Sequence, residues 1–229
     1  FYTLWQTIKH TRSIKSIYMN DYKTVAEIAS DEIVEKKSRF IADVSPCKTE
    51  EEALSFLQTV KKKYPDASHH VYAYVCRDNN SRRYSDDNEP QGTAGIPTLD
   101  VILKEGLTDT CVVTTRYFGG TLLGASGLVR AYSKAAKKGI DAARPVNMIF
   151  SDIFTVKTNY QDLGKIQYDI KKNGFSILST EFTENVSISV CTECSRSEEL
   201  VKKLTECSMG SAKIEKTDTC FVPREVCIN

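Results

Sequence analysis

The stretch from Asp109 to Ala143 constrains the fold of this 229-residue chain more than any other. It opens with the β-branched, apolar run Cys111–Thr115, continues through Arg116-Tyr117-Phe118 to the glycine-rich turn Gly119–Gly127, and becomes a helical pattern at Leu128. A strand, a glycine loop and a helix in this order direct backbone N–H groups and a helix N-terminus toward an anion. Because neither G-x-x-x-x-G-K-S/T nor G-x-G-x-x-G occurs here, the anion site is a hypothesis.

The helical pattern that follows the glycines has two distinct faces. One face gathers small and apolar residues that suit close packing on a sheet, namely Leu128, Ala131, Tyr132 and Ala135. The other face gathers four basic residues, Arg130, Lys134, Lys137 and Lys138. A stripe of this kind is compatible both with a solvated helix face and with an anion-binding surface, and the sequence leaves both interpretations open.

The overall charge limits the classes of partner. A net charge of +1 argues against a dedicated, strongly basic binder of nucleic acids or membranes. The charge is unevenly spread, however, because Arg130 to Arg144 holds five bases and one acid, whereas Asp86 to Glu89 holds three acids and no base. Any binding to a polyanion would therefore depend on a local positive field.

Elements ahead of this stretch follow from alternation and turn residues. Extended segments are expected at residues 24–28, 31–36, 38–44, 70–76 and 82–85. Thr49 and Glu52 form a capping-box pattern at the start of a helix that Tyr64-Pro65 ends. A short helix is expected from Ile96 to Leu103, with Pro97 in its first turn.

Arg144-Pro145 marks a boundary between two domains. Beyond it the pattern predicts a strand at 148–157, a helix at 161–173, strands at 175–183 and 185–192, a helix at 195–207 and a strand at 212–222. This βαββαβ order is the ferredoxin-like arrangement. We therefore expect an α+β protein with an N-terminal extension at 1–18, an α/β domain at 19–145 and a ferredoxin-like domain at 146–229.

Several classes of protein are disfavoured. No apolar run reaches the roughly 18 residues of a membrane span, and residues 1–18 lack the features of a secretory signal. Eight cysteines without such a signal do not indicate a disulfide framework. Cys191 and Cys194 have the C-x-x-C spacing, but neither a second pair nor a histidine follows to complete a metal site. We expect a cytoplasmic protein without a bound metal or cofactor.

Four motifs in order resemble the YigZ/IMPACT family. They are Ser38-Arg39-Phe40-Ile41, His69-His70-Val71-Tyr72-Ala73-Tyr74, Asp86-Asp87-x-Glu89-Pro90-x-Gly92-Thr93-Ala94-Gly95, and Arg116-Tyr117-Phe118-Gly119-Gly120 continuing through Leu123-Gly124 to Gly127-Leu128-Val129-Arg130-Ala131-Tyr132. The resemblance covers about residues 20 to 222. It implies a first domain similar to domain 2 of ribosomal protein S5 and a second domain similar to the last domain of elongation factor G.

The resemblance also implies a connection with translation. Eukaryotic IMPACT proteins restrain signalling to a kinase that acts on a translation initiation factor, and only this broad theme carries over to a bacterial-type chain of two domains. Asn88 stands where glycine is common in the family, and Ala125-Ser126 where Thr-Gly is common. Asn88 tolerates a left-handed turn, and Ser126 offers a hydroxyl at the helix start.

An acidic constellation is the first candidate site. It comprises Asp86, Asp87 and Glu89, with His69 and His70 as further members. Carboxylates this close suit Mg²⁺ binding or general acid–base chemistry. The alternative is a turn in which an aspartate caps backbone N–H groups while Glu89 pairs with an arginine. Adjacent aspartates point to opposite faces of an extended chain, which makes convergence on one ion difficult.

The glycine loop is the second candidate site, for an anion or a nucleic acid. Its expected residues are Arg116, Gly119, Gly120, Gly124, Ser126, Gly127, Arg130, Lys134 and Lys138. The alternative is architectural, with glycines that only turn the chain and with Arg116 buried against Glu89 or Asp87. Tyr72, Tyr74, Tyr117 and Phe118 suit either base stacking or a place in the core.

Two functions of different classes follow. The first is a non-enzymatic, translation-associated regulator that binds RNA, the ribosome or a protein partner through the glycine loop and the basic helix. The second is a protein or enzyme that binds a nucleotide or phosphate ligand through Gly119–Gly127 and the acids at Asp86–Glu89. The sequence lacks a nucleophile elbow, a zinc signature and a Walker lysine, so catalytic residues are not expected.

Overall fold

The computed structural model describes residues 20–225, and the expected extension at 1–18 lies outside them. The chain divides into two compact units, which contain residues 22–147 and residues 148–222. Each unit has its own sheet, so the expected two-domain α+β fold is confirmed. In the part of the chain that the structure describes, no helix is long and apolar enough to cross a membrane.

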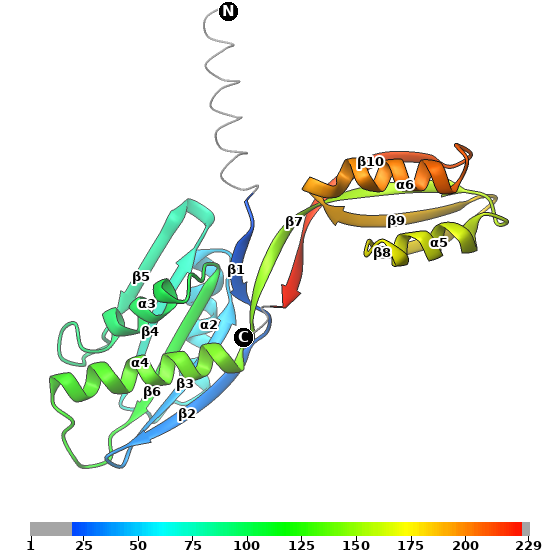
Figure 1. The fold of residues 1–229 in the computed structure, drawn as a ribbon. Helices are drawn as coiled ribbons and strands as arrows, with labels where there is room; N and C mark the ends of the chain where they lie inside the picture. The colour runs from blue at the N-terminus through cyan, green and yellow to red at the C-terminus, as the bar shows by residue number, and fades with distance from the viewer. Residues whose placement is uncertain (1–19, 226–229) are drawn as a thin grey trace, which may run out of the picture. The chain divides into compact units, whose positions relative to one another are not determined.

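The first unit is built on a five-stranded antiparallel sheet in the order β2-β3-β6-β4-β5 (Figure 1). Its strands are β2 (Ala29–Glu35), β3 (Ser38–Pro46), β4 (His69–Cys76), β5 (Ser81–Ser85) and β6 (Thr110–Tyr117). Its other elements are β1 (Tyr22–Val25), α2 (Glu50–Lys63), the 3-10 turn η1 (Asp78–Asn80), α3 (Gly95–Lys104) and α4 (Ala125–Ala142). This is the α/β arrangement expected for the first domain.

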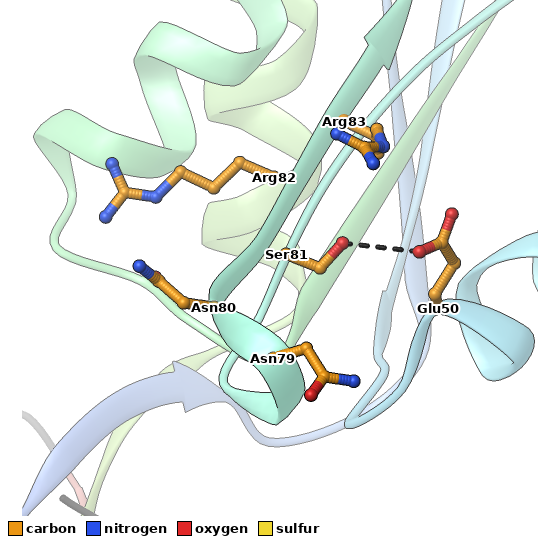
Figure 2. Close-up of a pocket in the computed structure, with 6 residues that line it drawn as sticks. All are labelled: Glu50, Asn79, Asn80, Ser81, Arg82 and Arg83. Carbon is orange, nitrogen blue, oxygen red and sulfur yellow. Dashed lines mark hydrogen bonds between the residues drawn. The ribbon is translucent and has the colours of Figure 1, made fainter.

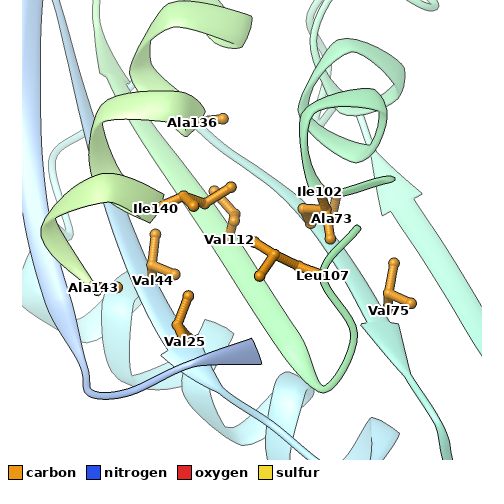
Figure 3. Close-up of a cluster of buried hydrophobic side chains, with 10 residues drawn as sticks. All are labelled: Val25, Val44, Ala73, Val75, Ile102, Leu107, Val112, Ala136, Ile140 and Ala143. Atoms are coloured by element: carbon orange, nitrogen blue, oxygen red, sulfur yellow. The ribbon is translucent and has the colours of Figure 1, made fainter. Parts of the chain in front are cut away.

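Alternation along the strands gives the sheet two apolar faces. On one face Val44, Ala73 and Val112 pack against α3 and α4, which contribute Ile102 and Ile140 among others (Figure 3). On the opposite face Tyr74, Cys111 and Val113 pack against the apolar side of α2. Because both faces are covered, the central strand β6 is buried along almost its whole length, which explains its apolar, β-branched sequence.

The helix ends follow the expected local signals in most places. Thr49 caps α2, since its side chain accepts a hydrogen bond from the Glu52 N–H at 3.2 Å. The start of α4 differs, because the helix begins at Ala125 and not at Leu128. Ala125-Ser126-Gly127 is therefore the first turn of the helix, and the loop proper ends at Gly124, whose φ of 75° suits glycine.

The second unit has the expected βαββαβ order. Its elements are β7 (Pro145–Thr158), α5 (Leu163–Lys172), β8 (Ser176–Phe182), β9 (Val186–Glu193), the 3-10 turn η2 (Cys194–Arg196), α6 (Ser197–Cys207) and β10 (Lys213–Glu225). In the sheet β8 pairs with β9, β9 pairs with β7, and β10 also pairs with β7, as in a ferredoxin-like fold. Ile166, Ile170, Leu200 and Leu204 from the helices are fully buried against it.

Close packing of α4 on the sheet depends on Gly139. A Cβ at this position would lie 2.8 Å from the Ala42 Cβ and 2.9 Å from the Val44 Cγ2. Both neighbours belong to β3, so the helix cannot accept even a methyl group without moving away from the sheet.

We predict that Gly139→Ala lowers the free energy of unfolding by roughly 1–2 kcal/mol, because overpacking outweighs a helix-propensity gain of about 1 kcal/mol. The matched control is Gly164→Ala in α5, where a Cβ would meet no atom within 4 Å. That substitution should stabilise its own unit by about 0.5 kcal/mol. Denaturant unfolding monitored by circular dichroism measures both. A stabilising Gly139→Ala would show that α4 does not pack this closely on β3.

Candidate functional site

A buried ion pair lies beneath the start of the glycine loop. The strand register places Arg116 of β6 between Phe40 of β3 and His69 of β4. The Arg116 Nη1 donates a hydrogen bond to the Glu89 Oε1, and the exposed fractions of the two side chains are only 7% and 3%. The Tyr132 hydroxyl of α4 donates to the same oxygen at 2.8 Å. Three segments of the chain therefore meet at one carboxylate.

The surroundings of this carboxylate keep Tyr132 protonated. Burial, and then the charge of Glu89, raise the pKa of Tyr132 well above that of a free tyrosine. The hydroxyl is consequently a hydrogen-bond donor at every physiological pH. Its role here is to hold Glu89, and through it the polar loop ahead of α3, against the helix.

The two adjacent histidines serve opposite faces of the sheet. The His69 Nδ1 lies 2.7 Å from the Asp87 carbonyl oxygen and donates to it, because a carbonyl can only accept. The other nitrogen, Nε2, faces the ion pair at 3.8 Å from the Glu89 Oε1. The His70 Nε2 contacts the Tyr64 carbonyl oxygen at the end of α2 at 3.0 Å. The histidines therefore do not converge on one ligand.

The other acids of the cluster bind backbone N–H groups. The Asp86 carboxylate accepts hydrogen bonds from Gly92, Ala94 and Gly95 at 2.9, 3.0 and 2.8 Å, which caps the start of α3. The Asp87 carboxylate accepts from the His70 N–H at 2.6 Å. Within residues 20–225, no group of three or more His, Cys, Asp and Glu side chains is placed to hold a metal ion.

The glycine loop begins against the β2–β3 turn. The Gly119 N–H donates to the buried Ser38 hydroxyl at 3.1 Å, and a Cβ at Gly119 would collide with the backbone of Lys37. Glycine is therefore required there by the close approach of two backbones. Farther along, Gly120 has a left-handed φ of 79° and Ser126 is exposed in the first turn of α4.

A groove of about 310 Å³ lies between the β2–β3 hairpin and the start of α4. We call it the basic groove. It is lined by Ile33, Glu35, Lys36, Leu123, Gly127, Arg130, Ala131 and Lys134. Three of these residues are cations and one is an acid. In the part of the chain that the structure describes, Lys36, Arg130 and Lys134 form no ion pair, so the groove has more positive than negative charge.

Lys36 is a site residue that the sequence did not single out. It forms a two-residue turn with Lys37, and both residues have left-handed φ angles of 45° and 69°. Such turns usually contain Asn-Gly or Asp-Gly, so the lysine pair gave no turn signal. The short separation in sequence between the expected extended segments at 31–36 and 38–44 was the available indication of a hairpin.

The structure separates the four bases of the α4 stripe into two pairs. Arg130 and Lys134 line the basic groove. Lys137 instead binds Asp141 at 2.6 Å and Glu105 at 3.1 Å, and Lys138 lies 3.7 Å from Asp31. The basic surface on α4 that carries no ion pairs is thus smaller than the four-residue stripe. Acids already compensate the two C-terminal bases, Lys137 and Lys138.

The aromatic candidates also separate. Tyr74 is 2% exposed and donates to Glu50 at 2.7 Å, while Tyr72 stacks on it with the ring centroids 6.1 Å apart. The Tyr117 hydroxyl donates to Asp66 at 3.0 Å. Phe118 is different, since its ring is 51% exposed at the start of the loop that leads to the basic groove. Of these four aromatic rings, Phe118 offers the largest exposed fraction for stacking.

The two cysteines of the C-x-x-C spacing point to different partners. The Cys191 sulfur lies 3.9 Å from the Cys220 sulfur, and Cys194 donates to the Asp152 carboxylate at 3.1 Å. Burial raises the pKa of each thiol, Cys191 and Cys194, to about 11, so both are protonated at neutral pH.

We predict that Glu89→Ala lowers the free energy of unfolding by about 3–5 kcal/mol, because it leaves the buried Arg116 charge unpaired. Glu32→Ala is the matched control, since Glu32 pairs with Arg39 at 2.6 Å on the same sheet but is 45% exposed. Its loss should cost less than about 1 kcal/mol. Equal effects in urea unfolding would contradict the central role of the buried pair.

Comparison with known proteins places the chain in a family. Residues 36–140 match the model of the Impact N-terminal domain, and residues 156–211 match a domain of unknown function, DUF1949. The IMPACT family member YvyE of Bacillus subtilis is 37% identical over 91% of this chain and 96% of its own length. The IMPACT family member YigZ of Escherichia coli is 31% identical over 78% and 89%.

A solved structure has a similar fold. The crystal structure of a hypothetical protein is similar with a TM-score of 0.56 and 28% sequence identity, and the match covers 87% of this chain and 98% of the other. In this chain the Impact N-terminal domain precedes DUF1949, and the two matched domains lie on separate sheets. The chain therefore belongs to the IMPACT family.

Proposed function

We propose that this protein is a non-enzymatic regulator of translation that binds single-stranded RNA in the basic groove. The observation that carries the proposal is the set of three cations without an ion-pair partner among the described residues, Lys36, Arg130 and Lys134, around one groove. They come from two elements far apart in sequence, the β2–β3 turn and the first turns of α4.

Phosphate binding by such a groove needs no high net charge. Cations that lack protein partners release counterions from a nucleic acid when they contact its phosphates, and this release supplies much of the binding free energy. Ile33, Leu123 and Ala131 contribute the apolar part of the groove lining. The groove therefore supplies a local field that the whole-chain charge of +1 conceals.

The exposed ring of Phe118 favours a single strand over a duplex. Bases that are not paired can stack on an aromatic side chain, and such stacking contributes about 1–3 kcal/mol per base. Phe118 lies seven residues before Ala125, the first residue of the helix that carries Arg130 and Lys134, on the loop that leads into the groove. The arrangement supports a strand whose phosphates follow the cations while one base contacts the ring.

Binding of a nucleotide with catalysis is supported less well. The acids that would hold Mg²⁺ are engaged, since Asp86 caps α3, Asp87 binds the His70 N–H and Glu89 pairs with Arg116. The Arg116 charge is neutralised by the same pair. The connection with translation is inferred from family membership, and the groove indicates only the kind of ligand.

We predict that Arg130→Gln/Lys134→Gln weakens binding of a single-stranded RNA oligonucleotide at low salt. The slope of log K against log salt should become less negative by about 1.4, or 0.7 for each phosphate contact. The control is Lys137→Gln/Lys138→Gln, which removes the same charge from the same helix but from residues paired with acids. The control should leave the slope nearly unchanged. Fluorescence anisotropy over a range of salt concentrations measures both.

Two outcomes would overturn the proposal. The first is equal loss in the two double variants, which would mean that the groove has no special role. The second is the absence of measurable RNA binding by the wild-type protein at low salt. A further variant, Phe118→Ala, should weaken binding of single-stranded RNA and leave the salt slope unchanged, because stacking releases no counterions.

A further inference from the structure

The edge strand β5 has an outer side that no described strand pairs with, although Gly95 at the start of α3 packs against the backbone of its last residue, Ser85. In the sheet order β2-β3-β6-β4-β5 it is the last strand, and its residues pair only with β4, from Tyr72↔Ser85 to Cys76↔Ser81. Across residues 20–225, no backbone hydrogen bond from another segment reaches the outer side of β5. Its free N–H and C=O groups are therefore a template for one more strand. We call this outer side the β5 edge.

The β5 edge carries two arginines without compensating acids. Arg82 and Arg83 are exposed and extend to opposite sides of the strand (Figure 2). Neither forms an ion pair with any residue that the structure describes. The opposite directions follow from the two-residue period of a strand, so each face of the sheet has one cation at this edge.

A pocket of about 500 Å³ lies at the start of the strand. It is lined by Glu50, Asn79, Asn80, Ser81, Arg82 and Arg83 (Figure 2). Glu50 is the single acid of this lining, and its oxygens accept hydrogen bonds from the Tyr74 hydroxyl at 2.7 Å and the Ser81 hydroxyl at 3.4 Å. The side-chain amides of Asn79 and Asn80 and the guanidinium groups of Arg82 and Arg83 can bind a ligand that carries carboxylates.

The charge of the β5 edge determines which kind of strand can pair with it. Two β5 edges would place arginines opposite arginines, and like charges across paired strands are destabilising. The opposite sheet edge, β2, is acidic, but Asp31 and Glu32 are already paired with Lys138 and Arg39, and the Lys138 Nζ lies 3.5 Å from the Glu32 carbonyl oxygen. A second copy of this chain is therefore a poor partner on either edge.

We propose that the β5 edge binds an extended, acidic peptide segment of another protein by strand addition. Backbone hydrogen bonds to β5 supply affinity, and one carboxylate on each face of the added strand pairs with Arg82 or Arg83. A nucleic acid would satisfy the arginines but not the row of alternating backbone donors and acceptors. The inference is independent of the proposed RNA site, because the groove lies at the β2–β3 hairpin, across the sheet from β5.

The probe is a short blocked peptide of threonine and valine with two adjacent glutamates at its centre, which places one carboxylate on each face of the strand. One control peptide has lysines in place of the glutamates. A second control keeps the glutamates but carries N-methyl groups on alternate peptide nitrogens, which removes the pairing N–H groups without changing the charge. Fluorescence anisotropy gives the affinities, and hydrogen exchange of the full-length protein locates the bound strand.

The acidic peptide should bind about tenfold more tightly than either control peptide and should protect amides of residues 81–85. Arg82→Gln/Arg83→Gln should weaken binding of the acidic peptide about tenfold, whereas Arg130→Gln/Lys134→Gln should leave the affinity for this peptide unchanged. Both arginines are exposed, so circular dichroism and the unfolding midpoint of the double variant should match those of the wild type.

Four results would overturn the proposal. The N-methylated peptide binding as tightly as its parent would mean that charge alone attracts the peptide. Protection at β2 would place the peptide at the wrong edge. Loss of RNA binding in Arg82→Gln/Arg83→Gln, with the peptide unaffected, would assign the arginines to the nucleic-acid surface. No binding of the acidic peptide at millimolar concentration would show that the edge does not accept a strand.

Discussion

The contact between Arg116, Glu89 and Tyr132 determines where the other parts of the first unit lie. A buried guanidinium is tolerated only beside a buried carboxylate, and the carboxylate needs a further donor to satisfy its oxygens. Glu89 is brought into place by Asp86, which caps α3, and Tyr132 is brought into place by the packing of α4 on β3. The central strand, the polar loop and the longest helix of this unit are thus fixed relative to one another by one charge pair.

Because Glu89 neutralises the charge of Arg116, the positive field of this region has another origin. It comes from Lys36, Arg130 and Lys134, whose side chains form no ion pair with any described residue. The family motifs around Arg116 therefore have a structural role that is clear from the contacts. The groove beside them gathers the cations that face solvent. The charges that fix the fold and the charges that line the basic groove therefore belong to different side chains.

The sequence was informative where one local pattern decided the outcome. The strand β3, the Thr49 cap of α2 and the βαββαβ order of the second unit were predicted and are confirmed. The alternation in β3 indicated a half-buried strand, but β3 is buried from Phe40 to Ser45 because helices cover both faces of the sheet. The start of α4 was placed too late, because the first turn Ala125-Ser126-Gly127 resembles a loop in composition. In that turn Gly127 is buried beside Leu123, whereas Ala125 and Ser126 are exposed.

The composition of the candidate site was harder to predict, since it depends on contacts between distant segments. Helical spacing put Arg130, Lys134, Lys137 and Lys138 on one face, but spacing does not show that Glu105 and Asp31 compensate the last two. Lys36 enters the groove only because Gly119 lets two backbones approach. Pairings of this kind arise from the tertiary fold, so no periodicity in one segment reveals them.

The left-handed turn at Lys36-Lys37 has a consequence for the speed of recognition. A two-residue turn between paired strands leaves its backbone few alternative conformations, and the close contact with Gly119 removes more of them. The backbone that carries the Lys36 cation therefore loses little conformational entropy when the cation meets a ligand. Association should then be governed by diffusion in the local electric field and not by a slow rearrangement of the loop. Two uncommon backbone angles thus place a charge in advance of the encounter.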